Sequence, residues 1–246
     1  MVFLNGQFIE QQKAFISVMD RGFLFADGVY EVIPVYNSKI FKVNEHLERL
    51  EKNLKELNIT ISYSKDEIIA IIQKLIKKNN FKHQSIYLQI TRGADKDRKH
   101  SFQKQLTPTI FIKSSELLPY PFDYLKQGHH CLTQRDIRWG RCDIKSTSLL
   151  ANVLYAQSAK EQQVEEIILV RDDIITEGAS SNVFIIKNNT LITHPENKHI
   201  LSGITRKTVL EIAESINLKV KEKTFTKDEL YNADEVFIRY QQIKKL

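Results

Sequence analysis

Apolar and polar positions alternate with a period of two in several short stretches of the chain, which is typical of strands. The clearest stretch is residues 2–9, where two apolar runs flank Asn5-Gly6, a dipeptide that favours a two-residue hairpin. A second hairpin is expected to turn at Asn37-Ser38. The strands that these patterns predict before residue 118 lie at 2–9, 29–36, 39–42, 86–91 and 109–113, with a polar loop at 93–105.

Between these strands the period lengthens to that of an amphipathic helix. Four leucines from residue 47 to residue 57 follow one another at spacings of 3, 4 and 3, which places them on one face of a helix. Ser64 and Glu67 have the spacing of a capping box, so a second helix is expected to begin there and to end near Asn79-Asn80. Residues 1–118 are therefore expected to form an α+β domain.

Both periods stop at Pro119-Tyr120-Pro121, so residues 119–122 are expected to be a linker and residues 123–246 a second α+β domain. A helix expected at 147–161 carries Leu150, Val153 and Leu154 along one side. The other elements expected in this domain are strands at 130–133, 167–170, 183–187, 191–193, 219–223 and 236–238, and helices at 205–216 and 227–230.

Composition excludes several classes of protein. Lys and Arg number 36 against 30 Asp and Glu, a net charge of +6, but the basic residues are scattered and indicate solvated faces rather than a nucleic-acid surface. The two cysteines, Cys131 and Cys142, are too few for a disulfide framework or a cysteine zinc cluster. Apolar runs fall far short of the roughly 20 residues of a membrane helix. We expect a cytoplasmic protein that binds no metal, nucleic acid or membrane.

Lys145 is the first residue with candidate chemistry. It ends the stretch RWGRCDIK at 138–145, just before an expected helix. A lysine that is poorly hydrated, or that lies near cations such as Arg138 and Arg141, becomes a nucleophilic amine. Taken alone, Lys145 is better explained as a surface lysine just before a helix.

Glu177 is the second candidate, a single carboxylate among the small residues of 176–184 (TEGASSNVF). Small residues let a planar ligand approach the backbone, and the carboxylate suits a protonated ring nitrogen. A tight turn with local Ser and Asn hydrogen bonds is the alternative interpretation.

The third candidate is a helix start, Gly203-Ile204-Thr205. Its exposed N–H groups and the positive end of the helix dipole form a seat for an anion. Alone, it is explained as an ordinary helix start.

Together, and in this order, a lysine, a carboxylate and a helix N-terminus are what pyridoxal phosphate needs from a protein. From about residue 5 to residue 238 the sequence resembles the class IV, or fold-type IV, pyridoxal-phosphate aminotransferases, and among them the bacterial D-amino-acid (D-alanine) aminotransferases. The stretches that carry the resemblance are Asp20-Arg21-Gly22, 27–31 (DGVYE), 43–46 (VNEH), 135–146 and 176–184.

The resemblance implies a role for each matching residue. Lys145 holds the cofactor as a Schiff base and moves the Cα proton of the substrate, and Glu177 keeps the pyridine nitrogen protonated. The other residues matched to cofactor contacts are Arg49, His46, Ile204 and Thr205 for the phosphate, Leu201 under the ring, and Ser180 and Ser181.

A carboxylate trap separates the D-amino-acid enzymes from their relatives. Tyr30, Arg98 and His100 match this trap, in a loop that is one residue longer before the arginine than the usual pattern and has Lys99 in place of a small residue. In the family this loop reaches the active site of the neighbouring subunit, so the resemblance implies a homodimer. Branched-chain L-aminotransferases and aminodeoxychorismate lyases share Lys145 and Glu177 but not the Arg-x-His loop, and they stay as alternatives.

The C-terminus departs from the family pattern. After residues 234–238 the family continues with a Ser/Thr-rich turn, a strand and a helix, whereas this chain reads RYQQIKKL at 239–246. A truncation or frameshift is the expected cause, with a loss of hydrogen bonds to the phosphate. The sequence therefore predicts a pyridoxal-phosphate-dependent D-amino-acid transaminase that acts on D-amino acids and 2-oxo acids, with a catalytically impaired remnant as a further alternative.

Overall fold

The computed structural model describes residues 1–118, 123–124 and 127–240, so the linker expected at 119–122 lies outside the described residues. The chain divides into two compact units. The first unit holds the described residues up to Leu118 together with Lys145–Ser148, and the second holds the rest. Each unit combines helices with antiparallel or mixed sheet, which confirms the α+β class predicted from the sequence.

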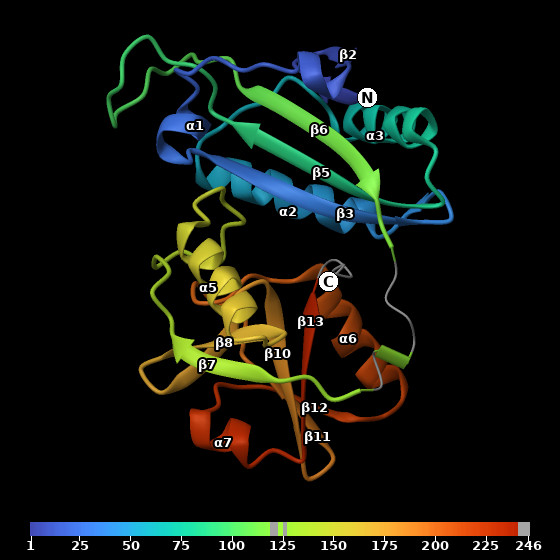
Figure 1. The fold of residues 1–246 in the computed structure, drawn as a ribbon, viewed down its shortest axis with the longest axis vertical. Helices are drawn as coiled ribbons and strands as arrows, with labels where there is room; N and C mark the ends of the chain where they lie inside the picture. The colour runs from blue at the N-terminus through green and yellow to red at the C-terminus, as the bar shows by residue number, and fades with distance from the viewer. Residues whose placement is uncertain (119–122, 125–126, 241–246) are drawn as a thin grey trace. The chain divides into compact units, whose positions relative to one another are not determined.

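The first unit is built on a six-stranded antiparallel sheet in the order β2-β1-β6-β5-β3-β4 (Figure 1). Both predicted hairpins are confirmed, and Asn5 and Gly6 turn the first one with φ of 46° and 90°. The strands are β1 (Val2–Leu4), β2 (Gln7–Ile9), β3 (Gly28–Tyr36), β4 (Lys39–Ile40), β5 (His83–Thr91) and β6 (Thr109–Glu116).

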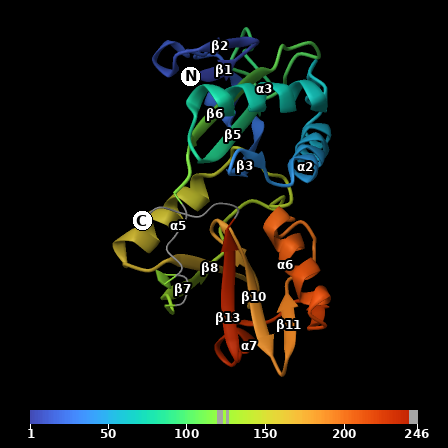
Figure 2. The same cartoon turned by 90° about the vertical axis from the view of Figure 1, so that its right-hand side faces the viewer.

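Two amphipathic helices, α2 (Val43–Glu56) and α3 (Lys65–Asn79), pack on one face of this sheet (Figure 2). The capping box of Ser64 and Glu67 is present, as predicted. The strand expected at 39–42 ends at Ile40, because Lys42 already stands at the N-cap of α2. Two short helices that the sequence patterns did not predict are η1 (Gln11–Lys13) and α1 (Arg21–Phe25).

Strand alternation decides what faces these helices. In β3, Val29, Ile33 and Val35 are fully buried on the face that α2 and α3 cover. Glu31 has the same parity, so a carboxylate is buried where the pattern otherwise places aliphatic side chains. Tyr30 has the opposite parity and lies on the other face, beside Tyr87 of β5.

Residues 145–148 extend along the start of β3. The N–H of Tyr30 donates to the carbonyl of Lys145 at 3.0 Å, and the N–H of Thr147 donates to the carbonyl of Gly28 at 3.0 Å. These bonds pair Ser146 and Thr147 with the start of β3, which is why the helix predicted to begin at residue 147 begins at Leu150 instead.

The second unit contains a four-stranded sheet, β12-β11-β10-β13, and a three-stranded sheet, β7-β8-β9. The strand β9 was not predicted as a strand; its residues belong to the stretch around Glu177. The elements are β7 (Cys131–Arg135), α5 (Leu150–Glu161), β8 (Glu166–Arg171), β9 (Ile174–Gly178), β10 (Ser181–Lys187), β11 (Thr190–Thr193), α6 (Ile204–Ser215), β12 (Lys219–Glu222), α7 (Lys227–Tyr231) and β13 (Glu235–Tyr240).

The two sheets of this unit share a core. Ile168 of one sheet and Val183 of the other belong to the same buried cluster, whereas Phe184 faces α6 and Leu169 faces α5. The central strands β8 and β10 are therefore covered on both faces, which explains their nearly continuous apolar sequences.

On α5 the side with Leu150, Val153 and Leu154 is exposed, and Tyr155 and Ala159 are buried. Within the described residues, no helix combines the length and apolarity required to cross a bilayer.

Candidate functional site

The residues singled out from the sequence fall into two groups, one in each unit. The first unit holds six of them, Tyr30, His46, Arg49, Arg98, His100 and Lys145. The second unit holds the other six, Glu177, Ser180, Ser181, Leu201, Ile204 and Thr205. Each group is built from its own elements.

Lys145 is held by its own backbone against the start of β3. Lys145 is only 9% exposed, and its Nζ lies 4.4 Å from the centroid of the Tyr30 ring. An ammonium over an aromatic face exchanges part of its hydration for the quadrupole of the ring. The chain thus presents a poorly hydrated amine, the condition under which a lysine serves as a nucleophile.

Glu31, which sequence reasoning missed, connects this lysine to α2. Its Oε1 accepts from Nε of Arg49 at 2.7 Å, and its Oε2 accepts from Nη2 of Arg49 at 2.8 Å. Nδ1 of His46 lies 2.8 Å from the same Oε2. The structure therefore brings His46 and Arg49 together, as their helical spacing predicts, with a carboxylate between them.

These contacts fix the charges of the cluster. Burial by itself would raise the pKa of Glu31, but the charge and hydrogen bonds of Arg49, the bond to His46 and the charge of Lys145 outweigh it and lower the pKa to about 2. Burial lowers the pKa of His46 below its usual value, so at neutral pH the imidazole is uncharged. Because an ionised carboxylate only accepts, Nδ1 of His46 carries the proton.

The depressed pKa of Glu31 predicts an acid-sensitive stability. The difference between 4.5 in the unfolded chain and about 2 in the folded one corresponds to about 3 kcal/mol, present above pH 4.5 and lost as the pH falls toward 2. Chemical denaturation at a series of pH values should show Glu31→Gln less stable than wild type at pH 6 and nearly equal at pH 2. Glu48→Gln, on the exposed side of α2, is the matched control. A Glu31→Gln deficit that is constant with pH would contradict this result.

Arg98 and His100 lie on the loop between β5 and β6. Cζ of Arg98 is 5.1 Å from the centroid of the Phe25 ring, and the His100 ring is 5.4 Å from it. For these two residues, the aromatic contacts within the described part of the chain are both with Phe25. Both side chains are exposed at the end of the first unit.

In the second unit, Glu177 is buried near the end of β9 and is surrounded by donors. Its Oε1 accepts from Nη1 of Arg138, and its Oε2 accepts from Nδ2 of Asn182 at 3.1 Å and from the N–H of Leu201 at 3.0 Å. Leu201 therefore touches Glu177 through its backbone. Asn182 also donates to the carbonyl of Leu201 at 3.0 Å, which ties β10 to the segment before α6.

Arg138 is the main charge partner of Glu177. It also forms a bidentate pair with Asp136, with Nε–Oδ1 and Nη2–Oδ2 distances of 3.0 and 2.9 Å. Burial raises the pKa of Glu177, and Arg138 opposes that effect. The two carboxylates raise the pKa of Arg138 despite its burial, so it stays charged. The sequence suggested Arg138 and Arg141 as cations that activate Lys145. In the structure, Glu177 and Asp136 neutralise Arg138, and Asp143 neutralises Arg141.

Ser180 and Ser181 turn the chain from β9 into β10 over a buried carboxylate, Glu166. Both hydroxyls and the N–H of Ser180 donate to Oε2 of Glu166, at distances of 3.0 to 3.2 Å. A Cβ at Gly178 would collide with the Ser181 hydroxyl, so a larger residue there would displace that hydroxyl from Glu166. Glu166, another residue that the sequence analysis missed, holds the turn after Glu177.

The predicted anion seat is the start of α6. Gly203 is the N-cap and provides no side-chain hydrogen bond, so the first amides of the helix, including those of Ile204 and Thr205, have no capping side chain. A Cβ at Gly203 would collide with Oδ1 of Asn182, the same side chain that contacts Glu177. The carboxylate and the helix start are therefore coupled through Asn182.

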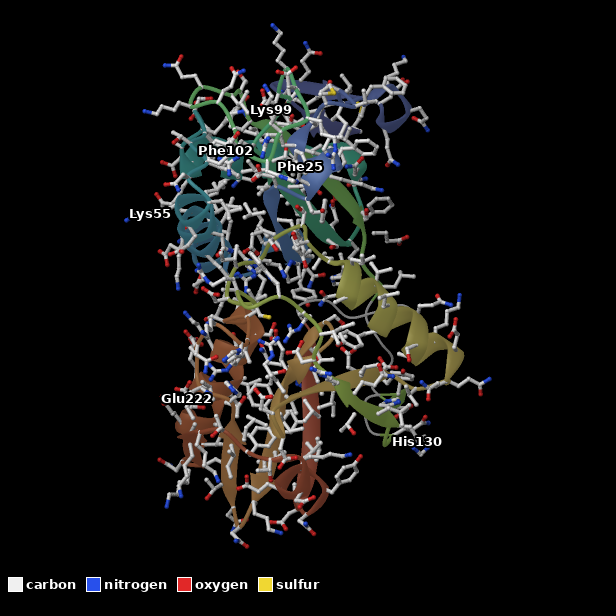
Figure 3. All side chains as sticks on the ribbon, turned by 90° about the vertical axis from the view of Figure 1, so that its left-hand side faces the viewer. Phe25, Lys55, Lys99, Phe102, His130 and Glu222 are labelled. Carbon is white, nitrogen blue, oxygen red and sulfur yellow. The ribbon has the colours of Figure 1, made fainter. Side chains whose placement is uncertain are left out.

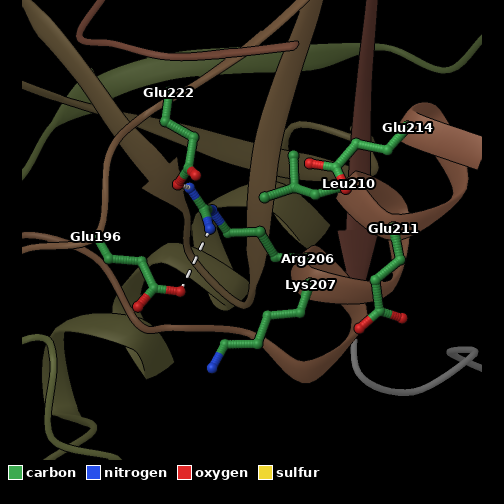
Figure 4. Close-up of a pocket in the computed structure, with 7 residues that line it drawn as sticks. All are labelled: Glu196, Arg206, Lys207, Leu210, Glu211, Glu214 and Glu222. Carbon is green, nitrogen blue, oxygen red and sulfur yellow. Dashed lines mark hydrogen bonds and ion pairs between the residues drawn. The ribbon is translucent and has the colours of Figure 1, made fainter. Parts of the chain in front are cut away.

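Arg206 anchors this helix start beside an acidic pocket of about 440 Å³ (Figure 4). Its Nη2 donates to Glu222 at 2.6 Å and to the carbonyl of His194 at 2.8 Å, and its Nη1 lies 3.4 Å from Glu196. The pocket is lined by Glu196, Arg206, Lys207, Leu210, Glu211, Glu214 and Glu222. Its four carboxylates disfavour an anion, so it does not compete with the helix start as a phosphate seat.

These donor sets fit the cofactor that the sequence resemblance implies. The first unit offers a buried amine beside the Glu31–Arg49 ion pair, and the second offers a buried carboxylate with an uncapped helix start joined to it by Asn182. An amine suits an aldehyde, a carboxylate suits a pyridinium, and helix amides suit a phosphate. Among the residues that the structure describes, no group of His, Cys, Asp and Glu side chains could hold a metal ion.

Comparisons with known sequences show close relatives. The family described as "Amino-transferase class IV" matches residues 28–239. D-alanine aminotransferases of Staphylococcus epidermidis (strain ATCC 12228 / FDA PCI 1200) and Staphylococcus aureus (strain N315) are each 43% identical over 237 residues, covering 96% of this chain and 84% of theirs. The D-alanine aminotransferase of Bacillus licheniformis is also 43% identical, over 96% of this chain and 83% of its own.

Solved structures show the same fold. The branched-chain amino acid aminotransferase of Escherichia coli has a TM-score of 0.89 at 25% identity, over 98% of this chain and 82% of that one. The T.th. branched-chain amino acid aminotransferase with pyridoxamine 5'-phosphate also has a TM-score of 0.89, at 23% identity and with the same coverage of 98% and 82%.

Proposed function

We propose that this chain, which belongs to the class IV aminotransferases, moves the amino group of a D-amino acid such as D-alanine to a 2-oxo acid such as 2-oxoglutarate, with pyridoxal 5'-phosphate as its cofactor. The observation that carries the proposal is the buried amine of Lys145 over Tyr30, beside the ionised carboxylate of Glu31. A cytoplasmic location agrees with the free thiols of Cys131 and Cys142.

The chemistry is divided between two residues. Pyridoxal phosphate, when bound, supplies an aldehyde for amines and a ring that withdraws electrons from them. Lys145 would hold the cofactor through its aldehyde group, and once the substrate amine has replaced it there, the released Nζ would take the proton from Cα of the substrate. Glu177 places a buried negative charge at the ring nitrogen and keeps it protonated.

The phosphate is assigned to donors from both groups. Arg49 is proposed to donate to it from α2, with His46 beside it on the same carboxylate, Glu31, and the amides of Ile204 and Thr205 are proposed to donate from the start of α6. Leu201 is proposed to lie under the ring, since its own N–H is bonded to Glu177. Ser180 and Ser181 are proposed as further contacts, on a turn that Glu166 holds.

Preference for D-amino acids is assigned to Tyr30, Arg98 and His100. A guanidinium binds a carboxylate with two parallel hydrogen bonds, and the phenol and imidazole add directed donors. Fixing the α-carboxylate on one side decides which enantiomer presents its Cα–H to Lys145. The D-alanine aminotransferases named above are 43% identical to this chain, whereas the branched-chain aminotransferase of Escherichia coli is 25% identical, so the D-amino-acid assignment is preferred to the L-specific and lyase alternatives.

A homodimer is part of the proposal. Phe15, Val18 and Phe23, which lie within nine residues of one another in the sequence, are 80%, 71% and 69% exposed in the single chain. Apolar side chains gathered on a surface mark an interface. The Arg98 loop is proposed to serve the site of the second subunit.

The function is tested by the enantiomer that reacts. Wild type with pyridoxal phosphate should transaminate D-alanine and not L-alanine or L-leucine. Arg98→Ala should lower kcat/KM for D-alanine by about 10²-fold, because the α-carboxylate loses the two hydrogen bonds from the guanidinium. Formation of the matching 2-oxo acid, pyruvate from alanine and 4-methyl-2-oxopentanoate from leucine, measures this, with Lys96→Ala on the same loop as the control. Equal use of D- and L-alanine by wild type would refute the assignment.

The shared site is tested with two inactive variants. If the Arg98 loop of one subunit completes the site containing Lys145 of the other, then mixing Arg98→Ala with Lys145→Ala restores one intact site per mixed dimer, or roughly a quarter of wild-type activity. Refolding the two variants together and assaying D-alanine measures it. A mixture no more active than its parts would contradict the shared site.

A further inference from the structure

The motif Asp20-Arg21-Gly22 has no assigned role in the reaction described above. We infer that Arg21 is a positioning residue that sets the place of the carboxylate-binding loop, residues 93–107, and thereby the substrate affinity. The inference rests on the proposed function, because the loop carries Arg98 and His100. It stands on four sets of contacts, all within the first unit.

The guanidinium of Arg21 is bonded to the loop backbone. Its Nη1 donates to the carbonyl of Lys99 at 2.7 Å, and its Nη2 donates to the carbonyl of His100 at 2.8 Å. The side chain is 4% exposed, so water does not compete with these bonds. The two carbonyls follow Arg98 directly and belong to the Arg-x-His segment, so one planar group fixes the peptide that orients both side chains.

A second arginine holds Arg21 in place through Asp27. Nε of Arg21 donates to Oδ2 of Asp27 at 2.9 Å. Arg92 pairs with both oxygens of Asp27, at 2.7 and 2.9 Å, and donates to the carbonyls of Leu57 and Asn58. The guanidinium of Arg21 is therefore oriented by Asp27 and Arg92, which are fixed at the end of α2, rather than by the loop.

Aromatic side chains complete the support. Cζ of Arg21 lies 4.9 Å from the centroid of the Phe25 ring and 5.6 Å from that of Phe102. Phe25 is also the ring that Arg98 and His100 contact. Figure 3 shows Phe25, Lys99 and Phe102 together at one end of the unit. The side chains of the substrate loop thus rest on the helix that begins with Arg21.

The ends of the loop are fixed to the same segment. The N–H of Arg21 donates to the carbonyl of Gly93 at 2.9 Å. Gly93 has a φ of +95°, and a Cβ there would collide with the carbonyl of Thr107. The two ends of the loop therefore approach each other so closely that only glycine fits at position 93. Asp20 caps α1 at Gly22 and accepts from the hydroxyl of Thr109 at 2.6 Å.

Charge balance selects the test variant. Arg21 faces Asp27 at 2.9 Å and Asp95 at 3.7 Å, both largely buried, so a neutral residue would leave buried carboxylates short of a cation. Arg21→Lys keeps the positive charge and the ion pair with Asp27. An ammonium, however, lacks the planar guanidinium that donates to the carbonyls of Lys99 and His100 at the same time. The variant is therefore expected to fold while the loop loses its anchor.

The experiment compares two amines on the holoenzyme. Ethylamine has the amine and methyl of alanine without the α-carboxylate. For Arg21→Lys we expect kcat/KM for D-alanine to fall by about 10- to 100-fold, mostly through KM, while the single-turnover rate with ethylamine changes less than about threefold. Lys96→Ala, which removes an exposed charge from the same loop, should leave both rates unchanged.

Backbone hydrogen exchange provides a readout that does not depend on activity. Amides of residues 97–102 should exchange at least about tenfold faster in Arg21→Lys than in wild type, while those of β5 and β6 keep their protection. Equal losses with D-alanine and ethylamine, or unchanged exchange in the loop, would overturn the role of Arg21. A wild type that does not use D-alanine would refute the proposed function, and the exchange result would then still decide whether Arg21 holds the loop.

Discussion

Replacing Lys145 by alanine should lower the rate of D-alanine transamination by about 10³-fold or more and abolish the visible absorbance of covalently bound cofactor. The expected loss is large because one amine performs two tasks, binding the aldehyde carbon and moving the Cα proton. Its burial over Tyr30 keeps this amine poorly hydrated, which favours both tasks. Stopped-flow absorbance with D-alanine measures both effects.

Lys145→Arg separates chemistry from structure. Arginine keeps a positive charge beside Glu31, so the depressed pKa of that carboxyl and the stability linked to it should persist, but a guanidinium does not lose its proton. We expect Lys145→Arg to be stable and inactive, and Lys160→Ala on the surface of α5 to be fully active. Added methylamine should restore part of the Lys145→Ala rate. A Lys145→Ala protein as fast as wild type would remove the basis of the assignment.

The local elements could be predicted because their signals are local. Asn5-Gly6 turns the first hairpin with both residues at positive φ, and Ser64 with Glu67 forms the capping box that begins α3. The signal for β9 was hidden, because its last residues are a carboxylate and a glycine rather than an apolar run. The five-residue helix α1 depends on the Asp20 cap and on contacts with residues about 70 to 90 positions away.

The start of α5 shows how a distant partner overrides a local pattern. Residues 147–149 continue the helical period in sequence, yet Thr147 is bonded through its N–H and its hydroxyl to the backbone of residues 26 and 28. Those bonds join positions about 120 residues apart, which periodicity does not reveal. The same pairing brings Lys145 beside Tyr30, so the error at the helix start and the geometry of the site have one cause.

Individual site residues came from the family resemblance, and the carboxylates that support them did not. Glu31 had a usable signal, because it interrupts the buried series Val29, Ile33 and Val35 with a charge that must find a partner. Glu166 had a weaker one, at the first position of an apolar strand. Arg138 was noticed as a cation for Lys145, and the structure gives it Glu177 and Asp136 as partners instead.

Glu177→Gln should lower the rate of the D-alanine half-reaction by about 10²-fold while leaving covalent attachment of the cofactor to Lys145 intact. An amide of the same size occupies the same space but places no negative charge at the ring nitrogen, so it cannot hold a proton there. Fold stability should suffer less than activity, because Arg138 keeps both of its bonds to Asp136. Rapid-mixing absorbance with D-alanine measures the rate, and thermal unfolding measures the stability.

Glu177→Asp provides the comparison that identifies charge as the cause. It keeps the carboxylate but retracts it by one methylene from Arg138, Asn182 and the N–H of Leu201. If the buried charge is what matters, Glu177→Asp should be several-fold to tenfold faster than Glu177→Gln, despite its poorer fit to these donors. If the two variants are equally slow, the three hydrogen bonds rather than the charge determine the rate, and the role of Glu177 at the ring nitrogen would have to be given up.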